Sequence, residues 1–164
     1  MNRGGKVLLI VIILVITISL FINSYKSSSS YICSDKYLSS KNEEERSVKS
    51  TNNNKNDYNY CSFEFEKFTG KWTIMEFKSG KNNYISIEDN SNIENGTFGI
   101  VVLDSNYNII KKKIDFKENS NISFKTSKDE KYSIRLVGKN ASGVVDIKVN
   151  AKDIVDIEHK EFFS

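Results

Sequence analysis

Oxygen-bearing side chains at alternate positions are the strongest chemical signal in this sequence. Asp104, Asn106 and Asn108 stand where the first, third and fifth ligands of a twelve-residue calcium loop would stand, and Asp115 falls at the twelfth. That loop needs glycine at its sixth position, but Ile109 stands there and three lysines follow it closely. The spacing therefore favours a turn between two strands over a metal site.

Other chemistries find little support. Asp89, Asn92 and Glu94 offer further oxygen ligands, but without the regular spacing of a calcium loop. The sequence has no Gly-x-Ser-x-Gly elbow, no His-Glu-x-x-His zinc motif and no phosphate-binding glycine loop. The single histidine, His159, lies in a charged C-terminal tail. We therefore predict that the protein is not an enzyme and has no catalytic, metal or cofactor-binding residues.

Two cysteines, Cys33 and Cys61, bracket a polar stretch of the chain. A disulfide between them would constrain the unfolded chain by about 3–4 kcal/mol in the usual entropic account. The stretch that it would close is itself expected to be disordered, so the sequence leaves open whether the two are bridged. A catalytic cysteine would need a nearby histidine, which the pattern does not place there.

A continuous apolar run, Val7–Ile22, follows a basic start and predicts that residues 1–26 form a membrane segment. Thr17 and Ser19 are its polar members, and both are tolerated in a membrane helix. The span between flanking lysines reaches about 30 Å, the thickness of the hydrocarbon core. We predict a single-pass anchor in the cell membrane, with the basic end in the cytoplasm and the C-terminal domain outside.

Two other fates of this segment stay open. A basic start and an apolar centre also describe a signal peptide, whose cleavage would leave the protein secreted. The bulky residues that fill the run, and the lack of a small-x-small site after it, favour the anchor. In a lipoprotein Cys33 would carry the lipid, but bulky Ile32 stands where such signals usually have a small residue.

The stretch 27–61 is predicted to be a disordered polar linker that gives the domain reach. It contains four successive serines, an acidic cluster and an asparagine-rich run, and no periodic apolar stripe. In the whole chain 24 basic residues nearly balance 21 acidic ones, and no nucleic acid is expected as a partner. The absence of proline and the abundance of Asn, Ile, Lys and Ser are typical of a low-GC Gram-positive bacterium.

Beyond the linker, apolar and polar residues alternate with the period of β-strands. A hairpin with its turn at Asp104–Asn108 lies at the centre of this region, and Gly138–Gly143 is expected to form another turn. We predict an all-β fold over residues 62–150, an antiparallel, jelly-roll-like β-sandwich of about eight strands. Residues 151–164 are expected to form a charged tail, in which Ile154, Val155 and Ile157 could add an edge strand or one helical turn.

Period-two alternation also predicts the core. Ser133 and Arg135 are expected to face water, so that Ile134→Ala should lower the melting temperature severely and Arg135→Ala only a little. Tyr132 shares the face of Ile134 and should reach a polar partner from its ring edge. The residues expected between the two sheets are Trp72, Phe98, Ile100, Val102, Ile134 and Leu136.

Several segments share the features of one known type of domain: Phe68–Gly70, Gly96–Asp104, Ile122–Phe124, Lys131–Gly138 and Ala141–Gly143. A strand ending in Leu-Asp leads to a turn, and a Tyr-x-Ile-x-Leu-x-Gly strand leads to a glycine-closed hairpin. Together they resemble a small β-sandwich module of exported Firmicutes proteins, and the pre-peptidase C-terminal domains of secreted peptidases. The resemblance covers about residues 63–149 and implies a jelly-roll-like sandwich without catalytic residues.

Phe68–Trp72 also resembles the Gly-x-Trp entry of a lipocalin barrel, although Phe63–Phe68 precedes it here. The sequence as a whole favours a membrane-anchored extracytoplasmic β-sandwich that binds a protein or an envelope polymer without catalysing a reaction. The alternatives are an accessory domain of, or a divergent, cell-envelope hydrolase, and a lipocalin-like binder of small ligands.

Overall fold

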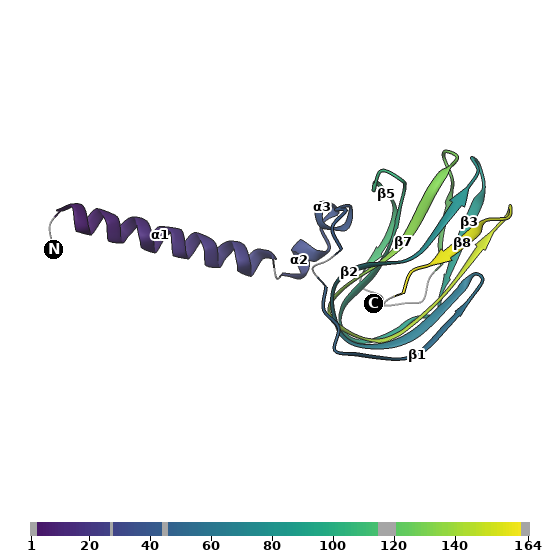
Figure 1. The fold of residues 1–164 in the computed structure, drawn as a ribbon, viewed down its shortest axis with the longest axis horizontal. Helices are drawn as coiled ribbons and strands as arrows, with labels where there is room; N and C mark the ends of the chain where they lie inside the picture. Colours follow the sequence, from purple (N-terminus) through teal and green to yellow (C-terminus); the bar gives the residue numbers. More distant parts are fainter. Residues whose placement is uncertain (1–2, 27, 44–45, 115–120, 162–164) are drawn as a thin grey trace.

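The computed structural model describes residues 3–26, 28–43, 46–114 and 121–161, and shows one long helix followed by a β-rich domain (Figure 1). Three helices come first: α1 (Arg3–Lys26), α2 (Ser29–Ile32) and α3 (Asp35–Leu38). The strands that follow are β1 (Ser50–Asp57), β2 (Tyr60–Ser79), β3 (Tyr84–Asp89), β4 (Asn92–Leu103), β5 (Ile109–Ile114), β6 (Ile122–Lys125), β7 (Glu130–Ala151) and β8 (Asp156–His159).

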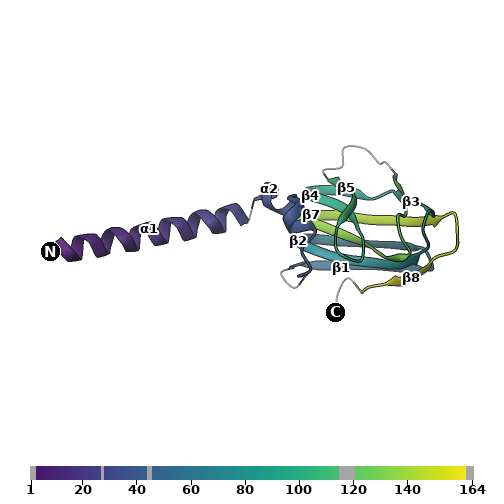
Figure 2. The same ribbon diagram turned by 90° about the horizontal axis from the view of Figure 1, so that it is seen from above.

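Helix α1 stands apart from the domain (Figures 1 and 2). Its large apolar side chains are all exposed. Its stretch Val7–Lys26 has 20 residues, contains an 18-residue window with a mean hydropathy of 2.9, and is long and apolar enough to span a membrane. Two hydroxyls inside it bond back to the helix backbone, Thr17 to the carbonyl of Leu14 and Ser19 to that of Val15, both at 2.9 Å. These bonds are consistent with a membrane anchor, because lipid offers a hydroxyl no partner.

Two long strands build the domain. β2 and β7 pair antiparallel along almost their whole lengths, from Tyr60 opposite Lys148 to Ser79 opposite Glu130. The strands curve midway, so that one continuous sheet folds over on itself into two layers (Figure 1). The first layer joins the second half of β2 and the first half of β7 to β8, β4 and β5. The second joins their other halves to β1, β3 and β6, which confirms the predicted antiparallel β-sandwich.

The core lies between the two layers, and the predicted alternation of β4 and β7 is confirmed. Trp72 is only half-buried and holds the guanidinium of Arg46 over its ring, 3.2 Å from the centroid. Tyr132 finds its polar partner, since its hydroxyl donates to the carbonyl of Lys128 at 3.1 Å. The other predicted core residues are at most 1% exposed: Phe98, Ile100, Val102, Ile134 and Leu136.

The predicted turn at Gly138–Gly143 is wrong, because β7 continues through it and only bends. At Gly138 the ring of Phe68 packs directly on the strand, in the space that a side chain would fill. At Gly143, with φ +151°, the backbone of Asn92 on β4 approaches equally closely. Glycine here permits close backbone contact in a bent strand instead of ending the strand.

The prediction of a disordered linker over 27–61 is wrong for the described part of that stretch. Helices α2 and α3 pack on the outer face of the first layer, where Ile32 is 4% exposed and Leu38 is fully buried. Strand β1 pairs with β2 at an edge of the second layer. Its sequence, STNNNKND, has no apolar residue. It therefore carries no alternation to detect, and it is held through backbone pairing.

The predicted charged tail, 151–164, also contributes to the sheet. β8 pairs with the end of β2, where Ile157 lies opposite Phe77. Val155 and Ile157 are at most 9% exposed and belong to the core. Two apolar residues at this spacing suffice for a short edge strand, although charged neighbours dominate the composition.

Candidate functional site

The predicted oxygen cluster around Asp104 is the turn that closes the β4–β5 hairpin. One oxygen of its carboxylate accepts hydrogen bonds from the backbone N–H groups of Asn106 and Asn108, both at 2.8 Å. The other accepts one from the side-chain amide of Asn108, also at 2.8 Å. Burial alone would raise the pKa of Asp104, but these bonds outweigh it and hold that pKa below its ordinary value. Asp115, the remaining candidate ligand, lies outside the described residues.

Asp104→Ala should therefore lower the free energy of unfolding by about 1–3 kcal/mol at neutral pH, because three donors lose a charged acceptor. Since the pKa of Asp104 is lowered on folding, its contribution is present above the pKa of an unfolded aspartate. It is lost as the pH falls through the lowered folded value. Urea titrations of the full chain in detergent at neutral and at strongly acidic pH test this. If Asp104→Ala lowered the free energy of unfolding equally at both pH values, the predicted pH dependence would be contradicted.

The second candidate stretch is also engaged within the protein. Asp89 is 1% exposed and forms an ion pair with Lys113 at 2.8 Å, while its other oxygen accepts the N–H of Ser91 at 3.1 Å. The side chains of Asn92 and Glu94 are exposed at the start of β4. Within the described residues, no three His, Cys, Asp or Glu side chains gather as a metal site would require.

The cysteines and the histidine occupy separate environments. Cys61 lies in the core on β2, where burial raises its pKa to about 12, so it is not a nucleophile at neutral pH. Cys33 caps the end of α2 on the outer side of the sheet, and no disulfide joins these two described residues. His159 lies on β8, with its Nε2 3.4 Å from the carbonyl oxygen of Tyr58.

Residues 28–43, which we call the strap, cover the outer face of the first layer. The strap contains α2 and α3, and Ser28 and Ser34 cap the N-terminus of each by accepting a backbone N–H. Beneath it lies a second apolar cluster, separate from the core, which contains Ile32, Leu38, Val101, Leu103 and Val137. The strap therefore buries the face of β4 and β7 that would otherwise expose an apolar patch.

Two buried cations of the sheet hold the end of α3. The Nζ of Lys71 donates to the carbonyl oxygens of Tyr37 and Ser40 at 2.7 and 3.2 Å. The Nη1 of Arg135 donates to those of Leu38 and Ser40 at 2.6 and 2.8 Å. Both side chains are at most 4% exposed. They satisfy carbonyl groups that the end of a helix leaves without intrahelical partners.

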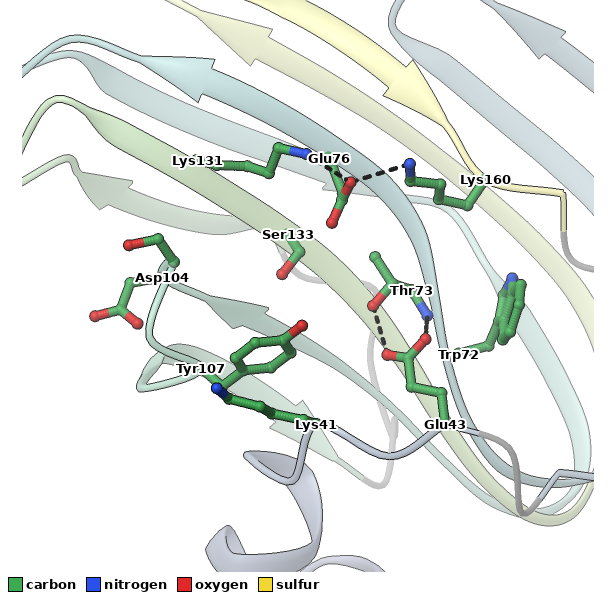
Figure 3. Close-up of a pocket in the computed structure, with 11 residues that line it drawn as sticks. Lys41, Glu43, Trp72, Thr73, Glu76, Asp104, Tyr107, Lys131, Ser133 and Lys160 are labelled. Atoms are coloured by element: carbon green, nitrogen blue, oxygen red, sulfur yellow. Dashed lines mark hydrogen bonds and ion pairs between the residues drawn. The ribbon is translucent and has the colours of Figure 1, made fainter.

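A buried ion pair completes the attachment of the strap. The Nε of Arg135 lies 2.6 Å from one oxygen of Glu43. Thr73 donates to the same carboxylate from its hydroxyl at 2.6 Å and from its backbone N–H at 3.1 Å (Figure 3). Burial lowers the pKa of Arg135, and the charge of Glu43 opposes that effect. The prediction that Arg135 faces water is therefore wrong, because the strap covers this face of the sheet. Ser133, also predicted to face water, is only 8% exposed.

A polar hollow of about 310 Å³ opens beside the strap (Figure 3). On one side of it Lys131 and Lys160 flank Glu76, with N–O distances of 3.0 and 3.1 Å. Burial would raise the pKa of Glu76, but the two lysines outweigh it and lower that pKa. The carboxylates that line the hollow are all bonded to protein groups, namely Glu43, Glu76 and Asp104. This arrangement stabilises the surface around the strap.

A six-residue repeat connects α1 to the strap. Its three units are Tyr25-Lys-Ser-Ser28, Tyr31-Ile-Cys-Ser34 and Tyr37-Leu-Ser-Ser40. In the first two, the serine hydroxyl donates to the carbonyl of the tyrosine at 2.6 Å and accepts the N–H of the next tyrosine at 3.2 or 3.4 Å. Successive tyrosine rings lie in contact, with centroids 5.5 and 5.3 Å apart. The chain thus passes from the apolar helix to the sheet through repeated, internally bonded turns.

The strap could not be recognised from its composition, because serine, lysine and acidic residues make up most of it. One signal was present: tyrosine recurs every six residues, each time with a serine three positions later. In the first two units that serine caps the helix that follows. Nothing in the local sequence of β2 or β7 indicates that Lys71 and Arg135 meet the end of this segment.

The comparisons with known proteins assign the chain to no family. No protein-family model matches it, and a search of curated proteins finds no match. Function is therefore inferred from the fold and from the contacts described above.

Proposed function

We propose that this protein is a membrane-anchored extracytoplasmic β-sandwich that acts as a non-catalytic interaction module. One observation carries the proposal: a fully exposed apolar helix of membrane-spanning length runs through bonded turns into a folded domain. The basic residues before the apolar run Val7–Ile22 favour a cytoplasmic N-terminus, which puts the domain outside. The domain is then a platform displayed at the cell membrane for a protein or an envelope polymer.

The packing of the domain supports a binding surface more than an internal ligand site. Aromatic side chains fill the space between the layers, where the rings of Phe65 and Phe98 stack with centroids 5.4 Å apart. A lipocalin-like protein needs an open calyx in that position. The hydrolase alternative rests on fold-level analogy alone, which is a weak argument for chemistry. Partners would instead meet the exposed edges and loops.

The interaction hypothesis is tested with the full chain, because a fragment that begins at Ser62 lacks β1 and the strap and exposes Val101 and Leu103. The chain is reconstituted in nanodiscs, incubated with an envelope extract and photo-crosslinked. The matched control carries residues 1–26 on an unrelated soluble domain. We expect a protein or polymer to be captured by the full chain and not by the control. Equal recovery from both would count against the proposal.

Cysteine labelling tests the topology. In intact cells without a wall, a membrane-impermeant maleimide should label Cys33, which is partly exposed, without any denaturant. Cys61 should react only after unfolding, because it is buried and burial raises its pKa to about 12. Cys33→Ser should therefore abolish native labelling, whereas Cys61→Ala should leave it intact. Labelling that requires permeabilised cells would place the domain in the cytoplasm.

A further inference from the structure

We propose that the row of rings formed by Tyr25, Tyr31 and Tyr37, the tyrosine row, enters the headgroup layer of the bilayer with Tyr25 and Tyr31 and holds the domain against the membrane through Tyr37. The partner of this surface is the lipid interface itself. The inference deepens the anchoring proposed above and rests on it. It replaces a freely moving tether with a domain that keeps one orientation on the membrane.

The depth of the row follows from the length of the helix. Val7–Lys26 contains 20 residues, which at 1.5 Å each cover about 30 Å, the thickness of the hydrocarbon core. Tyr25 therefore lies at the boundary, and the headgroups extend about 5–8 Å beyond it. The ring centroid of Tyr31 is 5.5 Å from that of Tyr25, so Tyr31 stays within or at the edge of this layer at any tilt.

The chemistry of the row fits this depth. Tyrosine is enriched at membrane–water interfaces, since its ring is apolar and its hydroxyl requires a polar environment. Tyr25 is 55% exposed in the structure, and Lys26 beside it can extend its ammonium group toward the headgroups. Tyr31 and Tyr37 are half-buried against the second apolar cluster, so Tyr25 is the most exposed ring of the row and the one that lies nearest the apolar helix.

The row is also attached firmly to the domain. The Nζ of Lys71 lies 4.4 Å from the ring centroid of Tyr37, and it donates to the carbonyl of the same residue. The side-chain hydroxyl of Thr97 on β4 donates a hydrogen bond to the hydroxyl of Ser29 at 3.3 Å, so the bent part of the sheet lies close to the strap. The loops at the strand ends far from α1 in Figure 1, such as Gly80–Asn83, then face away from the membrane.

A tryptophan scan of the full chain tests the inference. The background is Trp72→Phe, which removes no hydrogen bond because the indole Nε1 of Trp72 has no partner. Tyr31→Trp reports on the row, and Tyr84→Trp is the matched control, since Tyr84 is 52% exposed at the start of β3. Each variant is placed in phosphatidylcholine nanodiscs that carry a nitroxide on the headgroup or at the acyl-chain centre.

We expect the headgroup nitroxide to quench Tyr31→Trp more strongly than the acyl-chain nitroxide does, with a blue shift of its emission. Tyr84→Trp should be quenched by neither. If Tyr31→Trp is quenched no more than Tyr84→Trp while the protein still floats with the nanodiscs, the inference is overturned and the anchor stands. Failure to float would overturn the anchor itself, and the inference with it.

A second measurement leaves the tyrosine row intact. A nitroxide on native Cys33, two residues after Tyr31, reports depth through its relative accessibility to oxygen and to a soluble nickel complex. Cys61 stays unlabelled because it is buried in the core. Accessibility intermediate between lipid and water supports the inference. Accessibility equal to that of a nitroxide at Tyr84→Cys, compared after Cys33→Ser, would overturn it even if Tyr31→Trp did not fold.

Discussion

Replacing Arg135 with alanine should lower the free energy of unfolding by about 3–5 kcal/mol, as much as truncating a core residue. Its guanidinium is 1% exposed and binds Glu43, Thr73 and two carbonyl groups of the strap. Without it, the Glu43 carboxylate and those carbonyls lose a buried donor. Domains of this size are stable by about 5–15 kcal/mol, so the strap should detach or the domain should unfold at moderate urea concentrations.

Urea titration followed by far-UV circular dichroism, with the chain in detergent micelles, measures the effect. Lys131→Ala is the matched control, because this cation lies on the same strand but its side chain is 44% exposed. Ile134→Ala is the reference for a large effect, because truncating a fully buried aliphatic residue lowers the free energy of unfolding by about 2–5 kcal/mol. An Arg135→Ala variant as stable as Lys131→Ala would show that the strap does not cover this face.

A double-mutant cycle isolates the ion pair. Glu43→Gln alone should also lower the free energy of unfolding. In the double variant with Arg135→Met, the loss should be smaller than the sum of the losses in the two single variants. The reason is that removing both partners leaves no uncompensated buried charge. Additive effects would mean that Arg135 acts through the carbonyl groups of Leu38 and Ser40 rather than through Glu43.

Gly143→Ala is the second change with a large expected effect, a loss of more than about 3 kcal/mol. The residue has φ +151°, and a Cβ atom there would overlap the carbonyl oxygen of Asn92. That oxygen belongs to the backbone of β4, which pairs with β7 at this point, so it cannot move without breaking the ladder. The substitution should therefore open the bend where the two layers join.

Gly80→Ala is the matched control for this prediction. A Cβ at Gly80 would meet only the side chain of Asp129, at an ordinary contact distance of 3.6 Å. Thermal unfolding followed by circular dichroism should show a large fall in melting temperature for Gly143→Ala and little change for Gly80→Ala. Equal melting temperatures for the two variants would contradict the bend as we describe it.

Local chemistry was sufficient for one group of features. The apolar run Val7–Ile22 predicts its helix, because backbone groups in lipid must bond within their own segment. The alternation in Phe98–Leu103 and Tyr132–Leu136 predicts which residues enter the core, since side chains of a strand alternate strictly. Asp104 and Asn108 predict the hairpin turn, because their side chains bond the nearby backbone.

The tertiary structure decided the rest. Period-two alternation says that Arg135 and Ile134 face opposite sides, but not that a segment about a hundred residues earlier covers the outer side. Glycines at 138 and 143 look like a turn until Phe68 of β2 is seen packing on the first and the backbone of Asn92 on β4 approaching the second. The polar strand β1 is ordered by pairing with the neighbouring strand β2, and the serine-rich strap by residues of β2 and β7 that are distant in the sequence. Their order comes from backbone pairing and buried ion pairs, and neither leaves a periodic pattern in the residues themselves.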